Sequence, residues 1–361
     1  MHRNRPAARR FERTEKGRGW LIGRAIQPKP ASLDILFVLI FVCCLTGLSA
    51  CNRKPDDKTE TLALIPMGST DEFWKSVHAG GVQASEKLGV KIIWQGPIRR
   101  DDRTAQIDVV ENMIVRGVKG IILAPIDNMA LRAPVEDAYR NKIPVVIIDS
   151  NLNSDKSVSF VATDNYKGGI MAGEHMIRLL NGQGRVAMLR NVEGSASTDN
   201  RERGFLDTLK RAPGIKVVSS NLYAGATTES AYKQSENLLA PLKSASGEVA
   251  LDGIFCPNES SAFGMLRALQ DGGLTGKIRF IGFDSSEKLI EGLEKGHLDA
   301  LVVQDPVRMG YLGVEKLVDY LHGKPVEKKI DVPATLVTRE NLEQPKIKEL
   351  VAPDIKKWLR E

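Results

Sequence analysis

The stretch "TLALIPMGSTDEFWKSVHAGGVQASEKLGVKIIWQG", residues 61–96, indicates how the chain folds. It opens with a short apolar run, continues with apolar residues at helical spacing from Glu72 to Leu88, and ends in a second apolar run that follows Gly89. Glycine is typical just after the last helical residue because it adopts the left-handed backbone conformation without strain. The stretch therefore predicts a strand, a helix and a second strand in succession.

The same alternation continues along the chain. Apolar runs such as "GIILAPI", "PVVIIDS" and "IRFIGFD" are separated by segments of helical spacing, including residues 104–116 and 167–180. Near-continuous apolar strands between helices are typical of parallel sheets covered on both faces, so we expect an α/β, doubly wound fold. There are ten such runs, too many for one modest sheet, and their rhythm repeats after Asp164, so we expect two similar lobes.

The net charge of the chain is confined to its first 50 residues. The sequence has 51 Lys and Arg against 45 Asp and Glu, a formal charge of +6. Residues 1–50 carry nine of the basic residues and three of the acidic ones, so the remainder is balanced. A protein that binds nucleic acid through phosphate contacts needs an excess of Lys and Arg on its folded part. We therefore expect no nucleic-acid partner.

The N-terminal segment has the features of an export signal. The apolar run from Ile35 to Leu45 follows a basic segment and is shorter than the roughly 20 residues of a membrane-spanning helix. The sequence Leu48-Ser49-Ala50-Cys51 resembles the bacterial lipobox, in which the cysteine is lipidated. We expect residues 1–50 to be a lipoprotein signal peptide, Cys51 the lipidation site, and residues 51–60 a polar tether. The exported protein would then lie in the periplasm or cell envelope, anchored to a membrane. An ordinary signal peptide followed by a chance cysteine is the alternative.

Polar side chains follow several of the apolar runs. In open α/β sheets, ligands bind beyond the carboxyl ends of the strands. Helix capping accounts for about half of these positions, but it explains neither the adjacent aromatic pair Phe73 and Trp74 nor the amide of Gln304. Aromatic faces that stack on C–H groups, together with carboxylates and amides that pair with hydroxyls, suit a neutral polyol. The strand-end candidates are Asp71, Asp149, Ser150, Asn258, Asp284 and Gln304.

Seven motifs occur in the order of one known family. They are "GSTDEFWKSVHAGGVQASEKLGV", "IPVVIIDS", "ATDNYKGGIMAGEHM", "NRERGF", "GIFCPNESSAFGMLRAL", "FIGFDSS" and "DALVVQDP". With them, the chain resembles the ribose/galactose type of periplasmic sugar-binding proteins, the family that also supplies the effector domain of lactose-repressor-like regulators. The resemblance covers nearly all of residues 61–340. It implies two lobes that enclose a sugar and deliver it to an ABC permease, without any cofactor.

The resemblance also implies where the lobes begin and end. The chain would cross between them near Thr163 and Asp164, near Gln304 and Asp305, and around Asp331. The N-terminal lobe would comprise residues 61–163 and 305–331, and the C-terminal lobe residues 164–304 and 332–345. Residues 346–361 would form a charged tail.

By the same resemblance, Phe73 and Trp74 match aromatic positions that stack on the sugar. Two departures from the ribose-binding members concern specificity: Ser150 replaces an arginine, and Ala226 replaces a further aromatic. The positions that match polar groups gripping the sugar hydroxyls are Asp71, Asp149, Arg201, Asn258, Asp284 and Gln304.

Other classes of protein fit the sequence less well. The glycines of "GQGRVA", residues 182–187, precede a strand, whereas a dinucleotide-binding loop must follow one. Asp149 and Asp284 could serve as the acid and base of a glycosidase, but the motifs around them belong to a binding fold. The histidines are scattered, so we expect no metal site. Because no catalytic motif is in place, we expect no enzyme. A sensor subunit for a chemoreceptor or kinase, or a binder of a non-sugar polar solute, would carry the same features.

Overall fold

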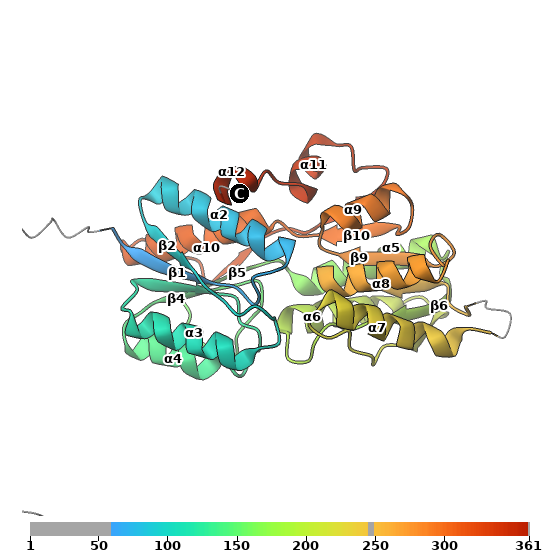
Figure 1. Cartoon of the computed structure of the whole chain (residues 1–361), viewed down its shortest axis with the longest axis horizontal. Coiled ribbons are helices and arrows are strands. Elements are labelled where there is room, and N and C mark those ends of the chain that lie inside the picture. Colours follow the sequence, from blue (N-terminus) through green and yellow to red (C-terminus); the bar gives the residue numbers. More distant parts are fainter. Residues whose placement is uncertain (1–58, 245–248, 360–361) are drawn as a thin grey trace, which may run out of the picture. The chain divides into compact units, whose positions relative to one another are not determined.

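The computed structural model describes residues 59–244 and 249–359. Within them the chain forms two six-stranded sheets, which we call the first and second lobes (Figure 1). The expected signal peptide, the lipidation site Cys51 and nearly all of the tether fall outside the described residues. Among the helices of the described part, none is both long and apolar enough to cross a membrane.

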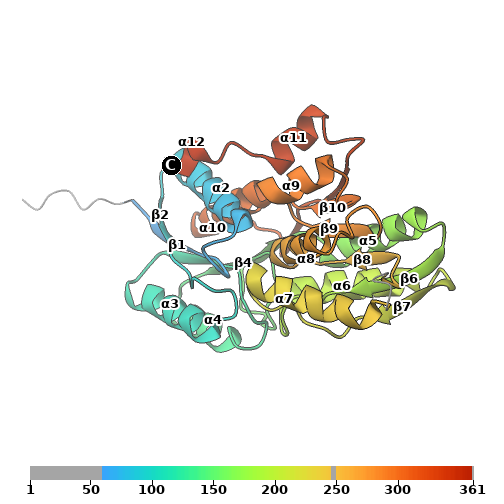
Figure 2. The same ribbon diagram turned by 45° about the vertical axis from the view of Figure 1, so that its right-hand side comes forward.

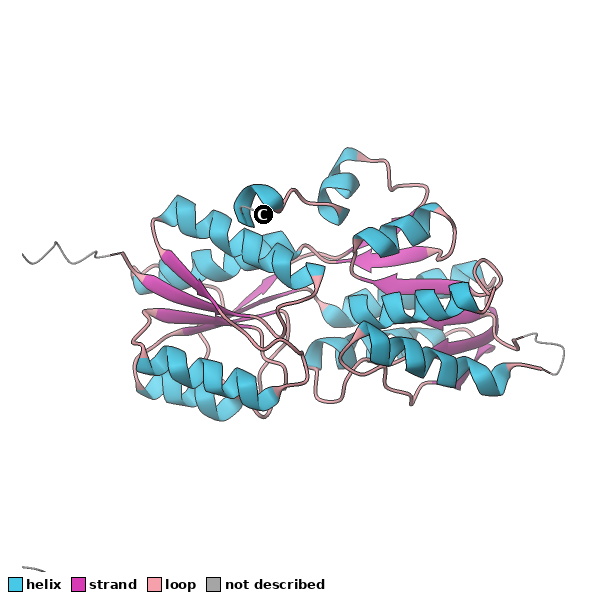
Figure 3. Cartoon of the chain, viewed as in Figure 1, coloured by secondary structure: helices cyan, strands magenta, loops and turns pink. Residues whose placement is uncertain are grey.

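The first lobe is a parallel sheet in the order β11-β5-β4-β3-β1-β2. Helices α2 and α10 cover one face of this sheet, and α3 and α4 cover the other (Figure 3). The elements are β1 (Thr61–Ile65), α2 (Glu72–Leu88), β2 (Lys91–Trp94), α3 (Arg103–Val115), β3 (Gly120–Leu123), α4 (Arg132–Arg140), β4 (Val145–Ile148), β5 (Ser159–Ala162), α10 (Pro306–Leu321) and β11 (Lys329–Asp331).

The second lobe has the order β12-β10-β9-β8-β6-β7 and is parallel except for β12. Helices α5 and α6 pack on one face, and α7, α8 and α9 on the other (Figure 2). The elements are α5 (Asn165–Leu179), β6 (Gln183–Met188), α6 (Ala196–Leu209), β7 (Gly214–Ser219), α7 (Thr228–Leu239), η2 (Ala240–Leu242), β8 (Gly253–Phe255), α8 (Glu259–Asp271), β9 (Arg279–Phe283), α9 (Glu287–Glu294), β10 (Ala300–Val303) and β12 (Thr335–Thr338).

The chain passes between the two sheets three times. It leaves the first sheet after Ala162, returns after Val303, and leaves again after Asp331 to form β12. Two similar doubly wound lobes are thus present, and the expected fold class is confirmed. Strands β11 and β12 escaped the sequence analysis because they are three and four residues long and are not continuous apolar runs.

The C-terminal tail reaches both lobes. Helix α11 (Pro345–Val351) buries Ile347 and Val351 in the core of the second lobe. Helix α12 (Lys356–Leu359) then packs beside α2 of the first lobe. The tail therefore adds a further connection between the lobes beyond the three passes of the sheets.

Glycine residues allow the inner helices to approach closely. A Cβ atom added at Gly169 of α5 would lie 2.0 Å from the carbonyl oxygen of Arg201 in α6, and one at Gly204 would lie 2.2 Å from that of Tyr166. Such separations are far inside van der Waals contact, so only glycine fits at these two positions. The contact with α5 thereby sets the position of α6, and with it the position of the Arg201 backbone.

Candidate functional site

A cavity lies between the two lobes, at the carboxyl ends of their strands. The first lobe contributes apolar and charged side chains, whereas the side chains that the second lobe contributes are polar or charged. The lining residues are Met67, Phe73, Arg100 and Asp149 from the first lobe, Asn191, Ser195, Ser197, Thr198, Arg201, Asn258 and Asp284 from the second, and Gln304 at the second pass.

Asp149 and Asp284 occupy equivalent places in the two lobes. Asp149 directly follows β4 and Asp284 directly follows β9. Both adopt a left-handed backbone conformation, with φ of 59° and 69° respectively. Aspartate tolerates this conformation better than most residues do, and such conformations concentrate at functional sites. The turn at each strand end directs a carboxylate toward the space between the sheets.

Arg201 lies between these two carboxylates and is held rigidly. Its Nε donates to Asn165 Oδ1 at 2.7 Å, and its Nη1 donates to the carbonyl oxygen of Pro257 at 2.9 Å. Its guanidinium stacks over the Phe283 ring at 3.9 Å from the ring centre. The shortest nitrogen-to-oxygen distances to Asp149 and Asp284 are both 3.8 Å, which are ion-pair rather than hydrogen-bond distances.

Burial and charge act against each other on this group. The pKa of Asp149 is raised to about 6, mainly by burial; Asp284 contributes to the shift, and Arg201 and Arg100 oppose it. Burial also lowers the pKa of Arg201, although Asp284 and Asp149 favour its charged form. The carboxylates and guanidinium therefore stabilise one another in a site from which water is largely excluded.

Three polar atoms at the cavity have no hydrogen-bond partner. In the described part of the chain, five buried side-chain nitrogen or oxygen atoms lack a hydrogen bond, and three belong to lining residues: Asn191 Oδ1, Arg201 Nη2 and Gln304 Oε1. Leaving such atoms unpaired costs free energy, so buried polar groups nearly always find partners. Two acceptors and one donor are thus available for a ligand that carries both donors and acceptors.

The two adjacent aromatics do not share one role. Phe73 lines the cavity, but Trp74 is fully buried in the core of the first lobe and is absent from the cavity lining. The two rings meet edge to face with their centres 4.9 Å apart. The structure therefore corrects the expectation that Trp74 stacks on the ligand: its ring supports Phe73 from behind.

Three further candidates have other contacts. Ser150 accepts a hydrogen bond at Oγ from the backbone N–H of Ser197, which joins the lobes, and Ser150 does not line the cavity. Asn258 lines it, but its Oδ1 caps α8 by accepting from the backbone N–H of Ser261. Asp71 precedes α2 without capping it, and its Oδ2 lies 3.5 Å from Arg100 Nε. Asp71 is also absent from the lining.

Two lining residues with charged or unpartnered atoms were not among the sequence candidates. Asn191 ends the run "RVAMLRN", so the rule about strand ends could have found it. Arg100 lies in the loop after β2 with a second arginine beside it, and the sequence does not distinguish the two. The structure does, since the side chain of Arg100 is 12% exposed and that of Arg99 is 63% exposed.

The cavity is narrow because the lobes touch around it. Besides the Ser150 contact, Glu259 of the second lobe accepts from the backbone N–H of Phe73, and Glu72 accepts from that of Glu287. The space that the centre of a water molecule can occupy is about 10 Å³, roughly the room one water needs. Any ligand larger than a water molecule therefore requires the lobes to separate.

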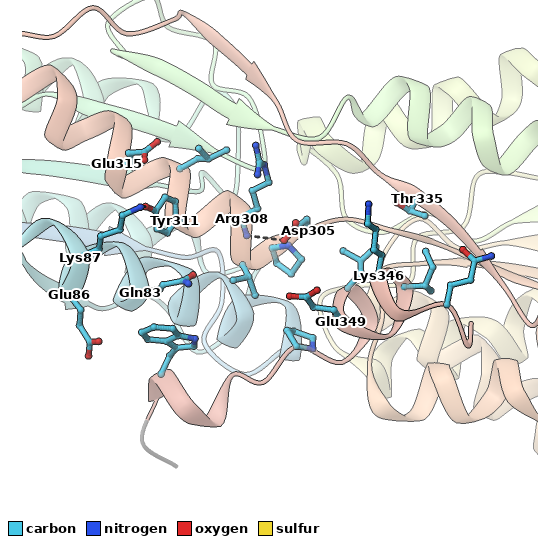
Figure 4. Close-up of a pocket in the computed structure, with 18 residues that line it drawn as sticks. Gln83, Glu86, Lys87, Asp305, Arg308, Tyr311, Glu315, Thr335, Lys346 and Glu349 are labelled. Carbon is cyan, nitrogen blue, oxygen red and sulfur yellow. Dashed lines mark hydrogen bonds between the residues drawn. The ribbon is translucent and has the colours of Figure 1, made fainter. Parts of the chain in front are cut away.

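A larger groove lies elsewhere, outside the space between the strand ends. It has a volume of about 1310 Å³ and runs between α2, α10 and the C-terminal tail (Figure 4). Several of its polar groups are already paired: Lys87 Nζ donates to the Tyr311 hydroxyl at 2.7 Å, and the backbone N–H of Arg308 donates to Asp305 (Figure 4). None of the unpartnered buried atoms of the described residues belongs to its lining, so the smaller cavity is the better candidate for a ligand site.

The fold and the cavity define a two-lobed solute-binding protein. A family model described as the periplasmic binding protein domain matches residues 62–325. The chain belongs to this family, whose type I members have the two-lobed fold found here, and it is a binding protein rather than an enzyme. Across residues 59–244 and 249–359, no cluster of three or more His, Cys, Asp or Glu residues is placed to hold a metal ion.

Its relatives include several sugar-binding proteins. The ribose import binding protein of Bacillus subtilis is 28% identical over 312 residues, covering 84% of this chain and 98% of the relative. A solute-binding protein from Agrobacterium vitis, solved with bound D-fucose, is 35% identical with a TM-score of 0.77, covering 81% of this chain and 99% of the other. Another, from Agrobacterium radiobacter, was solved with D-arabinose. It is 33% identical with a TM-score of 0.77, covering 82% of this chain and 99% of the other.

Proposed function

We propose that this protein captures a neutral monosaccharide between its lobes and delivers it to an ABC importer. The observation that carries the proposal is the set of three unpartnered buried atoms, Asn191 Oδ1, Arg201 Nη2 and Gln304 Oε1, around one cavity. A sugar hydroxyl both donates and accepts, so hydroxyls can satisfy all three atoms.

The charges of the cavity favour a neutral ligand. Two arginines and two aspartates line it, so their formal charges cancel. An acidic sugar would bring an additional negative charge into a buried site without a cation of its own, which is costly. The Phe73 ring supplies an apolar face against which the C–H groups of a sugar can pack.

The relatives support the same class of ligand. D-arabinose and D-fucose, the sugars bound by the two Agrobacterium proteins, carry no ionised group. The ribose import binding protein of B. subtilis supports a role in import by its name. We therefore propose Asp149, Arg201, Asn191, Asp284 and Gln304 as ligand contacts, with Phe73 as the stacking ring.

The same proposal includes a membrane anchor. The sequence Leu48-Ser49-Ala50-Cys51 supports lipidation at Cys51, after which a polar tether would hold the lobes near the permease. Metabolic labelling with a palmitate analogue should tag the wild-type chain and not Cys51→Ala. Labelling of both chains, or of neither, would contradict lipidation at this residue.

Calorimetric titration of the full-length chain tests the ligand. D-ribose, D-arabinose and D-fucose are the neutral sugars, and D-galacturonate is the acidic control. We expect micromolar or tighter binding of at least one neutral sugar and none of the acid. Failure to bind any neutral sugar, or a preference for the acid, would overturn the proposal.

A further inference from the structure

The first lobe has few groups that can donate a hydrogen bond to a ligand. Its four lining residues are Met67, Phe73, Arg100 and Asp149. Methionine and phenylalanine side chains have no polar hydrogen, and an ionised aspartate only accepts. Arg100 is therefore the one side chain of the described first lobe that lines the cavity and can donate to a sugar oxygen.

Arg100 is placed to act on the buried charges of the cavity. Its Nε lies 3.5 Å from Asp71 Oδ2, which helps to orient the guanidinium. Its positive charge lowers the pKa of Asp149 and of Arg201. Arg100, Asp149 and Arg201 line the same cavity, which is why the charge of Arg100 acts on both groups.

Arg100 differs from Arg201 in how many of its guanidinium nitrogens already have a partner within the protein. Two of the Arg201 nitrogens are committed to Asn165 and to the carbonyl oxygen of Pro257. Within the described residues, Arg100 has the single ion pair to Asp71 and no side-chain hydrogen bond. Its two terminal nitrogens thus form an unoccupied fork, a geometry that suits two adjacent oxygen atoms.

We propose that Arg100 binds two neighbouring oxygen atoms of the sugar from the first lobe and so determines which sugars the protein accepts. The proposal rests on the proposed function, because it assigns a role within the same cavity. It also gives a reason for the serine at position 150, which the ribose-binding pattern fills with arginine. A guanidinium from the loop after β2 takes that part here, and Ser150 is left to join the lobes through Ser197.

The test is calorimetric titration of full-length Arg100→Met and Arg100→Lys chains with whichever of D-ribose, D-arabinose and D-fucose binds the wild type. We expect Arg100→Met to bind at least tenfold more weakly. Arg100→Lys should fall between, because lysine keeps the charge and loses the fork. The matched control is Arg99→Met, which removes the neighbouring exposed arginine and should leave affinity within twofold. Thermal unfolding of each chain confirms that it is folded.

A second measurement separates a contact from an indirect effect. Deoxy analogues of the bound sugar, each lacking one hydroxyl, are titrated against the wild type and Arg100→Met. At least one deletion should weaken wild-type binding about tenfold and leave Arg100→Met binding unchanged, because the lost partner is already absent. Wild-type affinity in folded Arg100→Met, or equal losses in both chains for every analogue, would overturn the role of Arg100 while the proposed function stands. If the wild type binds none of the sugars, the proposed function fails and this inference fails with it.

Discussion

Glu259 of the second lobe accepts a hydrogen bond from the backbone N–H of Phe73 in the first lobe, with 3.3 Å between Oε2 and N. The contact places the carboxyl group at the N-terminus of α2, where the helix favours negative charge. The pKa of Glu259 is nevertheless raised to about 8, mainly by burial and further by the charges of Asp71, Asp284 and Glu72, while the hydrogen bond from Phe73 opposes the shift. Closure of the lobes thus brings the carboxyl groups of Glu259 and Asp284 close to those of Asp71 and Glu72.

We expect this cluster to make sugar binding depend on pH. Separation of the lobes would expose Glu259 and return its pKa toward the ordinary 4.5, so the closed form binds the extra proton between about pH 4.5 and 8. Closure is therefore favoured at the acidic end of this range and is weakened as pH rises through it. Affinity should fall by about tenfold or more from pH 6.5 to 9, a range that lies above the pKa of about 6 of Asp149.

The Glu259→Gln chain should lose most of this dependence, because glutamine keeps the shape and cannot ionise. Glu229→Gln, which changes an exposed glutamate in the first turn of α7, is the matched control and should titrate like the wild type. Calorimetry across the pH range provides the measurement. An affinity that rises with pH would show that the linkage has the opposite sign.

Replacement of Arg201 by lysine should weaken binding of the cognate sugar by at least tenfold. Lysine retains a charge, but a single ammonium group does not reproduce the bonds to Asn165 and Pro257 together with a free donor toward the cavity. Arg203→Lys, an exposed change in the same helix, is the control and should be neutral. Unaltered calorimetric affinity in Arg201→Lys would mean that the guanidinium is structural only.

Trp74 and Phe73 should differ in what their removal changes. Trp74→Ala empties a fully buried site in the first core and should lower the free energy of unfolding by about 3–5 kcal/mol. Phe73→Ala removes a ring at the cavity and should mainly lower sugar affinity. Denaturant unfolding and calorimetry of both chains measure the two effects. A stable Trp74→Ala chain with abolished binding would instead place the indole at the ligand.

Phe73 and Trp74 illustrate what the sequence could and could not predict about the fold and the site. The helical spacing predicted Glu72–Leu88 with the bounds that the structure has, and the strand-end rule led to Asp149 and Asp284. Neighbouring helix positions point about 100° apart, so Phe73 and Trp74 point in different directions, and here Phe73 rather than Trp74 lines the cavity. Which one faces it depends on how α2 packs against α10 and its sheet, and a single sequence does not contain that rotation. The same holds for the loop that turns Arg100 inward and Arg99 outward.

The packing of α5 on α6 gives the last prediction, which concerns a residue that touches no ligand. A methyl group at Gly169 would overlap the carbonyl oxygen of Arg201, so Gly169→Ala must move α6 away from α5. The Arg201 guanidinium would then lose its fit between Asn165, Pro257 and the two aspartates. We expect lower stability, by about 1–3 kcal/mol, together with weaker sugar binding.

Gly272→Ala is the matched control for this change, because the nearest atom to an added Cβ there is 3.1 Å away, at the C-terminus of α8. It should lower stability less than Gly169→Ala does, because the contact there is 3.1 Å rather than 2.0 Å, and it should leave affinity intact. Chemical denaturation reports the first quantity and calorimetry the second. If Gly169→Ala lowered stability while sugar affinity stayed at the wild-type value, the position of Arg201 would not depend on the α5–α6 contact, and the rigid placement of its guanidinium would have to come from Asn165 and Phe283 alone.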